Sequence, residues 1–188
     1  MPTDKQLRVW CRRIKASDRE AFASVFDVLH DRLARYALQI TGRKATARDV
    51  VQQAFTALWE MRSSLNPEES LEALLFRIVR NRAYNCKRDR QTRASNHEIL
   101  QRDTEPIRDT PAVDMDADRL EKHLRSWIVD LPERQQEALV LSRFEGLTHE
   151  EIGEVMEISP ATVNTHIVRA LKTLRRKVRS HHPDLQMP

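Results

Sequence analysis

The stretch that decides the fold is EGLTHEEIGEVMEISPATVNTHIVRALKTLRRKV, residues 145–178. Thr148, with Glu151 three residues later, has the spacing of a capping box and predicts that a helix begins there. Ser159 followed by Pro160 supplies an N-cap and a first turn with a fixed backbone angle, so a second helix is expected to start at Pro160. Two short-linked helices of this kind are typical of a helix-turn-helix.

The second of these helices has two distinct faces. Apolar residues recur at three- and four-residue spacing and should pack inward: Val163, Ile167, Leu171, Leu174 and Val178. The opposite stripe carries hydroxyls, an imidazole and cations, with Asn164 at its edge: Thr162, Thr165, His166, Arg169, Lys172 and Arg176. These groups suit base edges and phosphates in a major groove. A solvated surface face is the alternative, but the caps, the turn and the cations favour DNA binding.

The charges are segregated along the chain. The 188 residues carry a net charge of +4 and a pI near 9.3. Seven Arg and Lys residues against one Asp lie in 77–93, and six basic residues with no acid lie in 169–180, whereas 96–118 hold seven acids against two arginines. Two basic blocks around an acidic spacer indicate two modules that each meet a polyanion.

Other function classes find little support. Two cysteines, Cys11 and Cys86, do not form a disulfide framework, and neither a signal peptide nor a membrane-spanning run is recognised, so a soluble cytoplasmic protein is expected. His149-Glu150 begins a zinc-protease pattern, but Gly153 stands where the second histidine is required. We find no phosphate-binding glycine loop and no catalytic constellation. The chain is predicted to be no enzyme and to need no metal or cofactor.

An all-α fold is predicted, because only three glycines occur among many helix-forming residues. In the first module, helices are expected to end at Thr41-Gly42, to start again at a cap formed by Thr46 and Asp49, and to open a third time at Asn66-Pro67. Four helices are expected in the second module.

The predicted domain organisation follows the composition along the chain. Residues 1–17 form an N-terminal extension and 18–93 the first helical domain. A flexible acidic linker spans 94–118, because prolines and acids interrupt any helical period. Residues 119–180 form the second helical domain, and 181–188 are a tail.

Four segments together resemble a bacterial RNA polymerase sigma factor of the extracytoplasmic-function (ECF) group of the sigma-70 family. They are ARDVVQQAFTALWEMR (47–62), LLFRIVRNRAYNCKRDR (74–90), LPERQQEALVLSRFEGLTHEEIGEVMEIS (131–159) and ATVNTHIVRALKTLRRKV (161–178). The resemblance covers most of residues 18–180. It implies two domains, sigma regions 2 and 4, that bind core RNA polymerase through its beta-prime clamp helices and beta flap. It also implies promoter DNA as a partner, an anti-sigma protein as a further one, and no membrane insertion.

For the 47–61 helix, the resemblance implies docking on the clamp helices through Asp49, Gln52, Gln53 and Phe55. The family often has an acid where this chain has Gln53. Two alternatives stay open from the residues themselves: Asp49 caps its own helix, and Phe55 belongs to the core because it lies on the apolar stripe.

For the basic segment from Arg77 to Arg93, the resemblance implies capture of the −10 promoter element as single-stranded DNA. A melted strand needs groups that bind an extruded base, a stacking surface and cations. The residues expected to supply them are Arg80, Asn81, Arg82, Tyr84, Asn85, Lys87, Arg88 and Arg90. Tyr84 stands where the family commonly has an aliphatic residue, and burial against the helix is the alternative to base stacking.

The second domain is expected to read the −35 element as duplex. The resemblance places Asn164, Thr165, His166 and Arg169 at contacting positions. Gly153 replaces the usual alanine, and Glu157 occupies a turn position where glycine is favoured for its positive φ, which predicts a strained or rearranged turn.

A sigma factor that directs initiation at a specific regulon is therefore the predicted function. A stand-alone helix-turn-helix regulator would bind duplex DNA without polymerase and would leave the basic segment around Asn81 unexplained. A helical adaptor for acidic partners would have no promoter-dependent effect.

Overall fold

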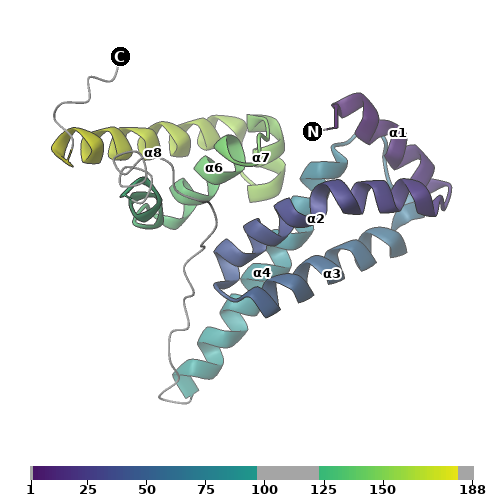
Figure 1. Ribbon diagram of the computed structural model, residues 1–188, viewed down its shortest axis with the longest axis horizontal. Coiled ribbons are helices and arrows are strands. Elements are labelled where there is room, and N and C mark those ends of the chain that lie inside the picture. The colour runs from purple at the N-terminus through teal and green to yellow at the C-terminus, as the bar shows by residue number, and fades with distance from the viewer. Residues whose placement is uncertain (1, 97–122, 182–188) are drawn as a thin grey trace, which may run out of the picture. The chain divides into compact units, whose positions relative to one another are not determined.

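A computed structural model describes residues 2–96 and 123–181, without the side chains of residues 94–96. Every regular element within these ranges is a helix, which confirms the all-α prediction. The chain divides into two compact units, Met1–Pro106 and Ile107–Pro188, and each is described by itself (Figure 1). Most of the predicted acidic linker, residues 97–118, lies outside the described residues.

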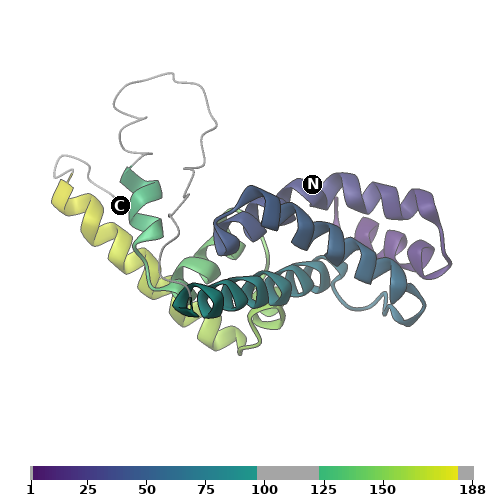
Figure 2. The same ribbon diagram turned by 90° about the horizontal axis from the view of Figure 1, so that it is seen from below.

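The first unit contains four α-helices: α1 (Asp4–Lys15), α2 (Arg19–Thr41), α3 (Lys44–Glu60) and α4 (Leu71–Asn96). A short 3-10 turn, η1 (Arg62–Ser64), follows α3. Helices α2, α3 and α4 pack together, and α4 runs on past the corner where α2 joins α3 (Figures 1 and 2). The C-terminal part of α4 therefore extends beyond the core that holds its start.

Helix α1 adds a packed element in residues 1–17, for which the sequence predicted only an extension. Thr3 caps α1 by accepting a hydrogen bond from the backbone of Gln6. Leu7, Cys11 and Ile14 recur at helical spacing and are all buried. The N-terminal segment is thus part of the core of the first unit.

Helix α2 is capped at both ends, of which the C-terminal cap was predicted. The Asp18 carboxylate accepts hydrogen bonds from the backbone N–H groups of Glu20 and Ala21. Gly42, at φ +69°, provides the left-handed C-cap, as predicted. The apolar stripe between these ends is buried in the core: Ala21, Val25, Leu29, Leu33, Tyr36 and Ala37.

Two predicted helix starts were wrong. Helix α3 begins at Lys44, so Thr46 lies within its first turn, and the N-cap residue Arg43 makes no side-chain capping bond. Helix α4 begins at Leu71, well after Asn66-Pro67. Asn66 instead folds its own loop by accepting from the backbone of Glu68, and Ser70 caps α4 by accepting from the N–H of Ala73.

A buried ion pair joins α2 to the start of α4. An Arg32 nitrogen lies 2.6 Å from a Glu72 oxygen, and the two side chains are only 8% and 15% exposed. The Arg32 guanidinium also lies 5.5 Å from the ring centroid of Phe76. The pair therefore links α2 to the start of α4, and its two charges offset each other where little solvent reaches them.

The described part of the second unit has the expected four helices: residues 123–129, α6 (Glu133–Arg143), α7 (His149–Met156) and α8 (Pro160–His181). One cluster of buried residues ties α8 to α6 and to the 123–129 helix: Trp127, Leu131, Leu139, Ala170, Leu174 and Val178. Next to this cluster, the Lys177 ammonium nitrogen lies 2.7 Å from an Asp130 carboxylate oxygen and forms an ion pair with it.

The helix-turn-helix has the predicted caps. Thr148 and Glu151 form a reciprocal capping box at the start of α7, and Ser159 accepts from the N–H of Thr162 at the start of α8. Glu157 adopts φ +57°, so a residue with a Cβ occupies the left-handed position predicted to be strained.

Gly153 allows the turn to approach α7 closely. A Cβ at this position would lie 2.8 Å from the carbonyl oxygen of Ile158, whose own N–H donates to the Gly153 carbonyl at 3.0 Å. Because the neighbouring atom is backbone, it cannot rotate away. The chain therefore needs glycine here, although glycine lowers the intrinsic stability of a helix.

We expect Gly153→Ala to lower the free energy of unfolding by about 1–3 kcal/mol, since the added methyl group overpacks the turn. Urea unfolding of the full chain measures this, with Glu154→Ala on the exposed side of the same helix as the control. A gain of about 1 kcal/mol, as helix propensity alone would give, would show that the turn moves freely.

A second prediction concerns acid pH. The hydrogen bond from Arg13 and those from the backbone N–H groups of Ala21 and Glu20 lower the pKa of Asp18 below its ordinary 3.8. A lowered pKa in the folded state means that this carboxylate stabilises the fold above that value and loses its effect as the pH falls through the folded pKa.

Asp18→Asn should therefore make the free energy of unfolding fall less steeply below about pH 4, while asparagine keeps the cap. Urea unfolding at a series of acid pH values tests this. Identical slopes for the two proteins would contradict it.

Candidate nucleic-acid interface

Helix α8 presents the predicted polar stripe to solvent. Its predicted apolar stripe is buried at Val163, Ile167, Leu174 and Val178 and half-buried at Leu171. Six of the seven residues predicted to contact DNA are exposed: Thr162, Asn164, Thr165, Arg169, Lys172 and Arg176. Arg175, which the sequence analysis did not select, is exposed as well. The helix thus offers hydroxyl and amide groups in its first turns and cations farther along.

His166 is the half-buried member of this stripe. Its ring nitrogen Nδ1 is buried and has no hydrogen-bond partner among the described residues. The nitrogen left for an outside partner is therefore Nε2.

Helix α4 carries the second candidate surface. Asn81, Asn85, Arg88 and Arg90 are exposed, and Lys87 is half-buried. The amide groups can bind the edge of an extruded base, and the cations can meet phosphates. These residues lie on the part of the chain that continues from the packed start of α4.

The expectation that Arg80 is available to phosphates was wrong. Arg80 is only 8% exposed, and its guanidinium lies 4.9 Å from the ring centroid of half-buried Tyr84. The Lys87 ammonium lies 5.7 Å from the same centroid. Tyr84 is thus held by cations of its own helix and is half-buried, and its stacking on a base stays a prediction.

Helix α3 bears a groove with a volume of about 360 Å³. The lining residues are Asp49, Gln52, Gln53, Thr56, Ala57, Glu60 and, from α4, Arg82. Asp49, Gln52 and Gln53 are exposed, as docking residues must be. Because α3 begins at Lys44, Asp49 lies in its second turn and is no N-cap, which removes the capping alternative.

Phe55 was wrongly predicted to belong to this surface. It is 3% exposed, and its ring centroid lies 4.7 Å from that of Phe26 and 6.0 Å from that of Phe22. An aromatic side chain between α2 and α3 contributes to packing and leaves no area for a partner. Its position on the apolar stripe was the signal for this role.

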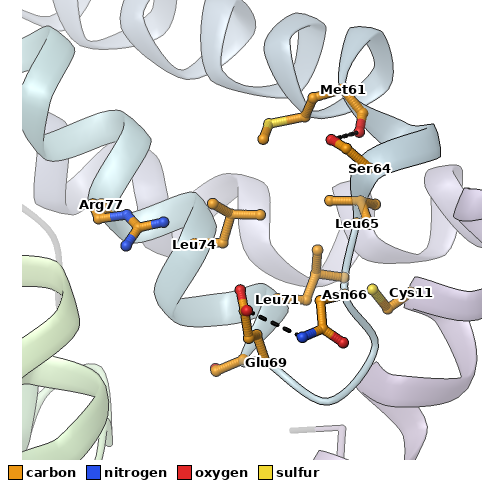
Figure 3. Close-up of a pocket in the computed structure, with 10 residues that line it drawn as sticks. Cys11, Met61, Ser64, Leu65, Asn66, Glu69, Leu71, Leu74 and Arg77 are labelled. Carbon is orange, nitrogen blue, oxygen red and sulfur yellow. Dashed lines mark hydrogen bonds between the residues drawn. The ribbon is translucent and has the colours of Figure 1, made fainter.

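The loop between α3 and α4 borders a smaller cavity of about 100 Å³ (Figure 3). Ser64 donates to the carbonyl of Met61, and Asn66 donates to Glu69, so the loop is held by its own hydrogen bonds. Cys11 lines the cavity, and burial raises the pKa of its thiol. The volume of this cavity is well below the roughly 300 Å³ at which small-molecule sites begin.

Both cysteines of the chain are free thiols, Cys11 buried and Cys86 exposed on α4. Among the described residues, no group of three or more His, Cys, Asp or Glu side chains is placed to hold a metal ion. No helix in the described ranges has both the length and the apolar character needed to cross a membrane.

Comparison with protein-family models gives two matches. Residues 25–93 match sigma-70 region 2, and residues 124–174 match sigma-70 region 4. Together the matches cover more than half of the 188 residues. The residues of the α4 surface fall within the first match, and those predicted for the α8 surface fall within the second except for Arg176, which follows it.

Curated relatives match over nearly the whole chain. The ECF RNA polymerase sigma-E factor of Haemophilus influenzae is 29% identical over 88% of this chain and 92% of its own. The RNA polymerase sigma-H factor of Pseudomonas aeruginosa is 26% identical over 93% of this chain and 94% of its own. The ECF RNA polymerase sigma factor SigW of Bacillus subtilis is 24% identical over 89% and 94%.

Solved structures share the fold at lower sequence identity. CnrH, in complex with the cytosolic domain of CnrY, has a TM-score of 0.67 and 23% identity, covering 93% of this chain and 98% of its own. RpoE of Bartonella quintana, in complex with the anti-sigma factor NepR, has a TM-score of 0.68 and 21% identity, covering 84% and 96%. With both regions matched, the chain belongs to the sigma-70 family of bacterial RNA polymerase sigma factors, in its extracytoplasmic-function group.

Proposed function

We propose that this protein binds core RNA polymerase and directs it to a specific set of promoters. In this proposal α4 captures the −10 element as a melted strand, α8 reads the −35 element as duplex, and α3 docks on the beta-prime clamp helices. The observation that carries the proposal is the presence of separate cationic faces on α4 and α8, one in each unit. The polymerase would perform nucleotidyl transfer, and this chain would supply recognition.

The surface of α8 suits duplex DNA. A single exposed stripe of one helix fits the major groove, where hydroxyl, amide and imidazole groups meet base edges. Arg169, Lys172 and Arg176 recur at three- and four-residue spacing along that stripe and can follow the phosphates. The apolar contacts beneath keep the helix rigid while its polar face is occupied.

The surface of α4 suits a melted strand. Asn81 and Asn85 are exposed four residues apart, so their amides lie on the same face and can bind the edges of unpaired bases. The accessible part of the Tyr84 ring lies near the same face, and Arg88 continues it toward the C-terminus. Capture of one or two extruded bases, rather than a long stacked strand, fits a surface with a single aromatic ring.

An anti-sigma protein is a further proposed partner. The solved structures most relevant here are complexes of CnrH with CnrY and of RpoE with NepR. The DNA surface of each unit is exposed within that unit. The factor would therefore need an inhibitor to keep it off DNA when its promoters are silent. Binding of such a protein would supply it by covering those surfaces.

Transcription by purified bacterial core polymerase on a fragmented genomic library, with and without this protein, tests the proposed function. New start sites that share two upstream motifs are expected. Duplex binding without polymerase, together with no new start sites, would replace the proposal with a stand-alone helix-turn-helix regulator.

The division of labour between the two surfaces predicts that Asn81→Ala and Arg169→Ala fail differently. Loss of Arg169 should weaken promoter binding by roughly five- to a hundredfold, and a higher holoenzyme concentration should restore melting. Loss of Asn81 should leave a melting defect that saturation does not restore, because base capture is absent.

Permanganate footprinting at rising holoenzyme concentration measures both effects. Arg19→Ala, which removes an exposed cation at the start of α2, serves as the control. Equal melting defects for the two variants at saturation would refute the division.

A further inference from the structure

The groove on α3 is lined by one residue from a different helix. Its α3 residues, from Asp49 to Glu60, form a single stripe about 16 Å long, given a rise of about 1.5 Å per residue. The small side chain of Ala57 leaves space within the groove. Arg82 reaches this groove from α4, and its Nη1 donates to the Gln53 side-chain oxygen at 3.0 Å.

The charge of Arg82 is not neutralised in the described part of the protein. Arg82 donates a hydrogen bond to the side-chain amide oxygen of Gln53, and no carboxylate of the described residues forms an ion pair with Arg82. An amide oxygen orients a guanidinium but leaves its positive charge in place. Asp49 and Glu60 likewise form no ion pair within the described ranges. The groove therefore presents a cation between two unpaired carboxylates.

Arg82 lies away from the residues that face DNA on the same helix. At about 100° per residue, Asn81, Asn85 and Arg88 point within a narrow arc, and Arg82 is about a quarter turn away from it. Asp89, seven residues on, shares the stripe of Arg82. An acidic side chain on this stripe disfavours phosphates, so the stripe does not suit the DNA backbone.

We infer that Arg82 is a polymerase-docking residue and that Gln53 positions it across the α3 groove. This inference rests on the proposed function and deepens it, because it defines the chemistry of the docking partner. The matching surface is a helix that presents a carboxylate to Arg82 and cations to Asp49 and Glu60, over about three turns.

The glutamine at position 53 accounts for the availability of Arg82. A carboxylate in its place would form an ion pair with Arg82 and would compete with a carboxylate of the partner. Gln53 holds the guanidinium in the same place without that competition. Arg82 on α4 thus offers the partner a charged contact beside the uncharged Gln53 of α3.

The test is the affinity of the full-length protein for core polymerase without DNA, measured by fluorescence anisotropy. We expect Arg82→Gln to weaken binding by about tenfold, because a charged hydrogen bond across the interface is lost. Arg82→Lys should lie between, since lysine keeps the charge but not the planar fork. Arg19→Gln, an equal loss of charge at an exposed site, should stay within about twofold.

The same variants are then compared on promoter DNA at saturating factor. Arg82→Gln should keep the salt dependence of the wild type, whereas Arg88→Gln, on the DNA-facing arc, should reduce the slope by about one unit, as loss of a phosphate contact does. The inference is overturned if Arg82→Gln binds polymerase like the wild type, and a lowered slope would then assign Arg82 to the DNA phosphates. Failure of the wild type itself to bind core polymerase would instead refute the proposed function.

The positioning role of Gln53 has its own readout. Gln53→Ala should weaken polymerase binding in the wild type but add nothing in the Arg82→Gln background, which a double-mutant cycle measures. Additive losses would show that Gln53 contacts the polymerase by itself and does not act through Arg82. Equal thermal unfolding of all variants confirms that the comparison is made between folded proteins.

Discussion

The surfaces of the first unit depend on how the start of α4 is fixed. The pair of Arg32 and Glu72 places opposite charges on two helices where the side chains have little access to solvent, so that each charge offsets the other. Packing of Phe76 beside Arg32 adds an aromatic contact at the same point. Farther along the helix, Val79, Arg80 and Ala83 are also buried, so packing along the N-terminal half of α4 sets the direction in which its exposed residues point.

In the second unit, the close approach at Gly153 has the corresponding role. The turn can fold back on α7 only because no Cβ stands in front of the Ile158 carbonyl. Glu157 adopts the left-handed backbone conformation that this turn requires, and that conformation is more strained for glutamate than for glycine. The two departures from the common helix-turn-helix pattern are therefore linked: one provides the space that the turn needs, and the other carries its strain.

Residues near helix ends show where sequence reasoning succeeded and where it failed. The capping box of Thr148, the cap at Ser159 and the glycine stop at Gly42 involve neighbours within a few residues, and all three were predicted. The starts of α3 and α4 were misplaced because their capping signals were weak or ambiguous. Arg43 gives α3 no side-chain cap, and Ser70 competes with the more conspicuous Asn66-Pro67.

The sequence by itself determined the helical class and the two modules, since these follow from composition and from the distribution of charge along the chain. It also determined the helix-turn-helix and the polar stripe of α8, since these follow from residue spacing over a few turns. Only the tertiary structure decided which members of a stripe stay accessible. Phe55 and Arg80 carry the right chemistry for a partner, yet neighbouring helices and Tyr84 bury them. The same packing brings Arg82 to Gln53 across 29 positions of the chain. Contacts between helices depend on which faces pack together, and the residue spacing within a single helix does not specify this.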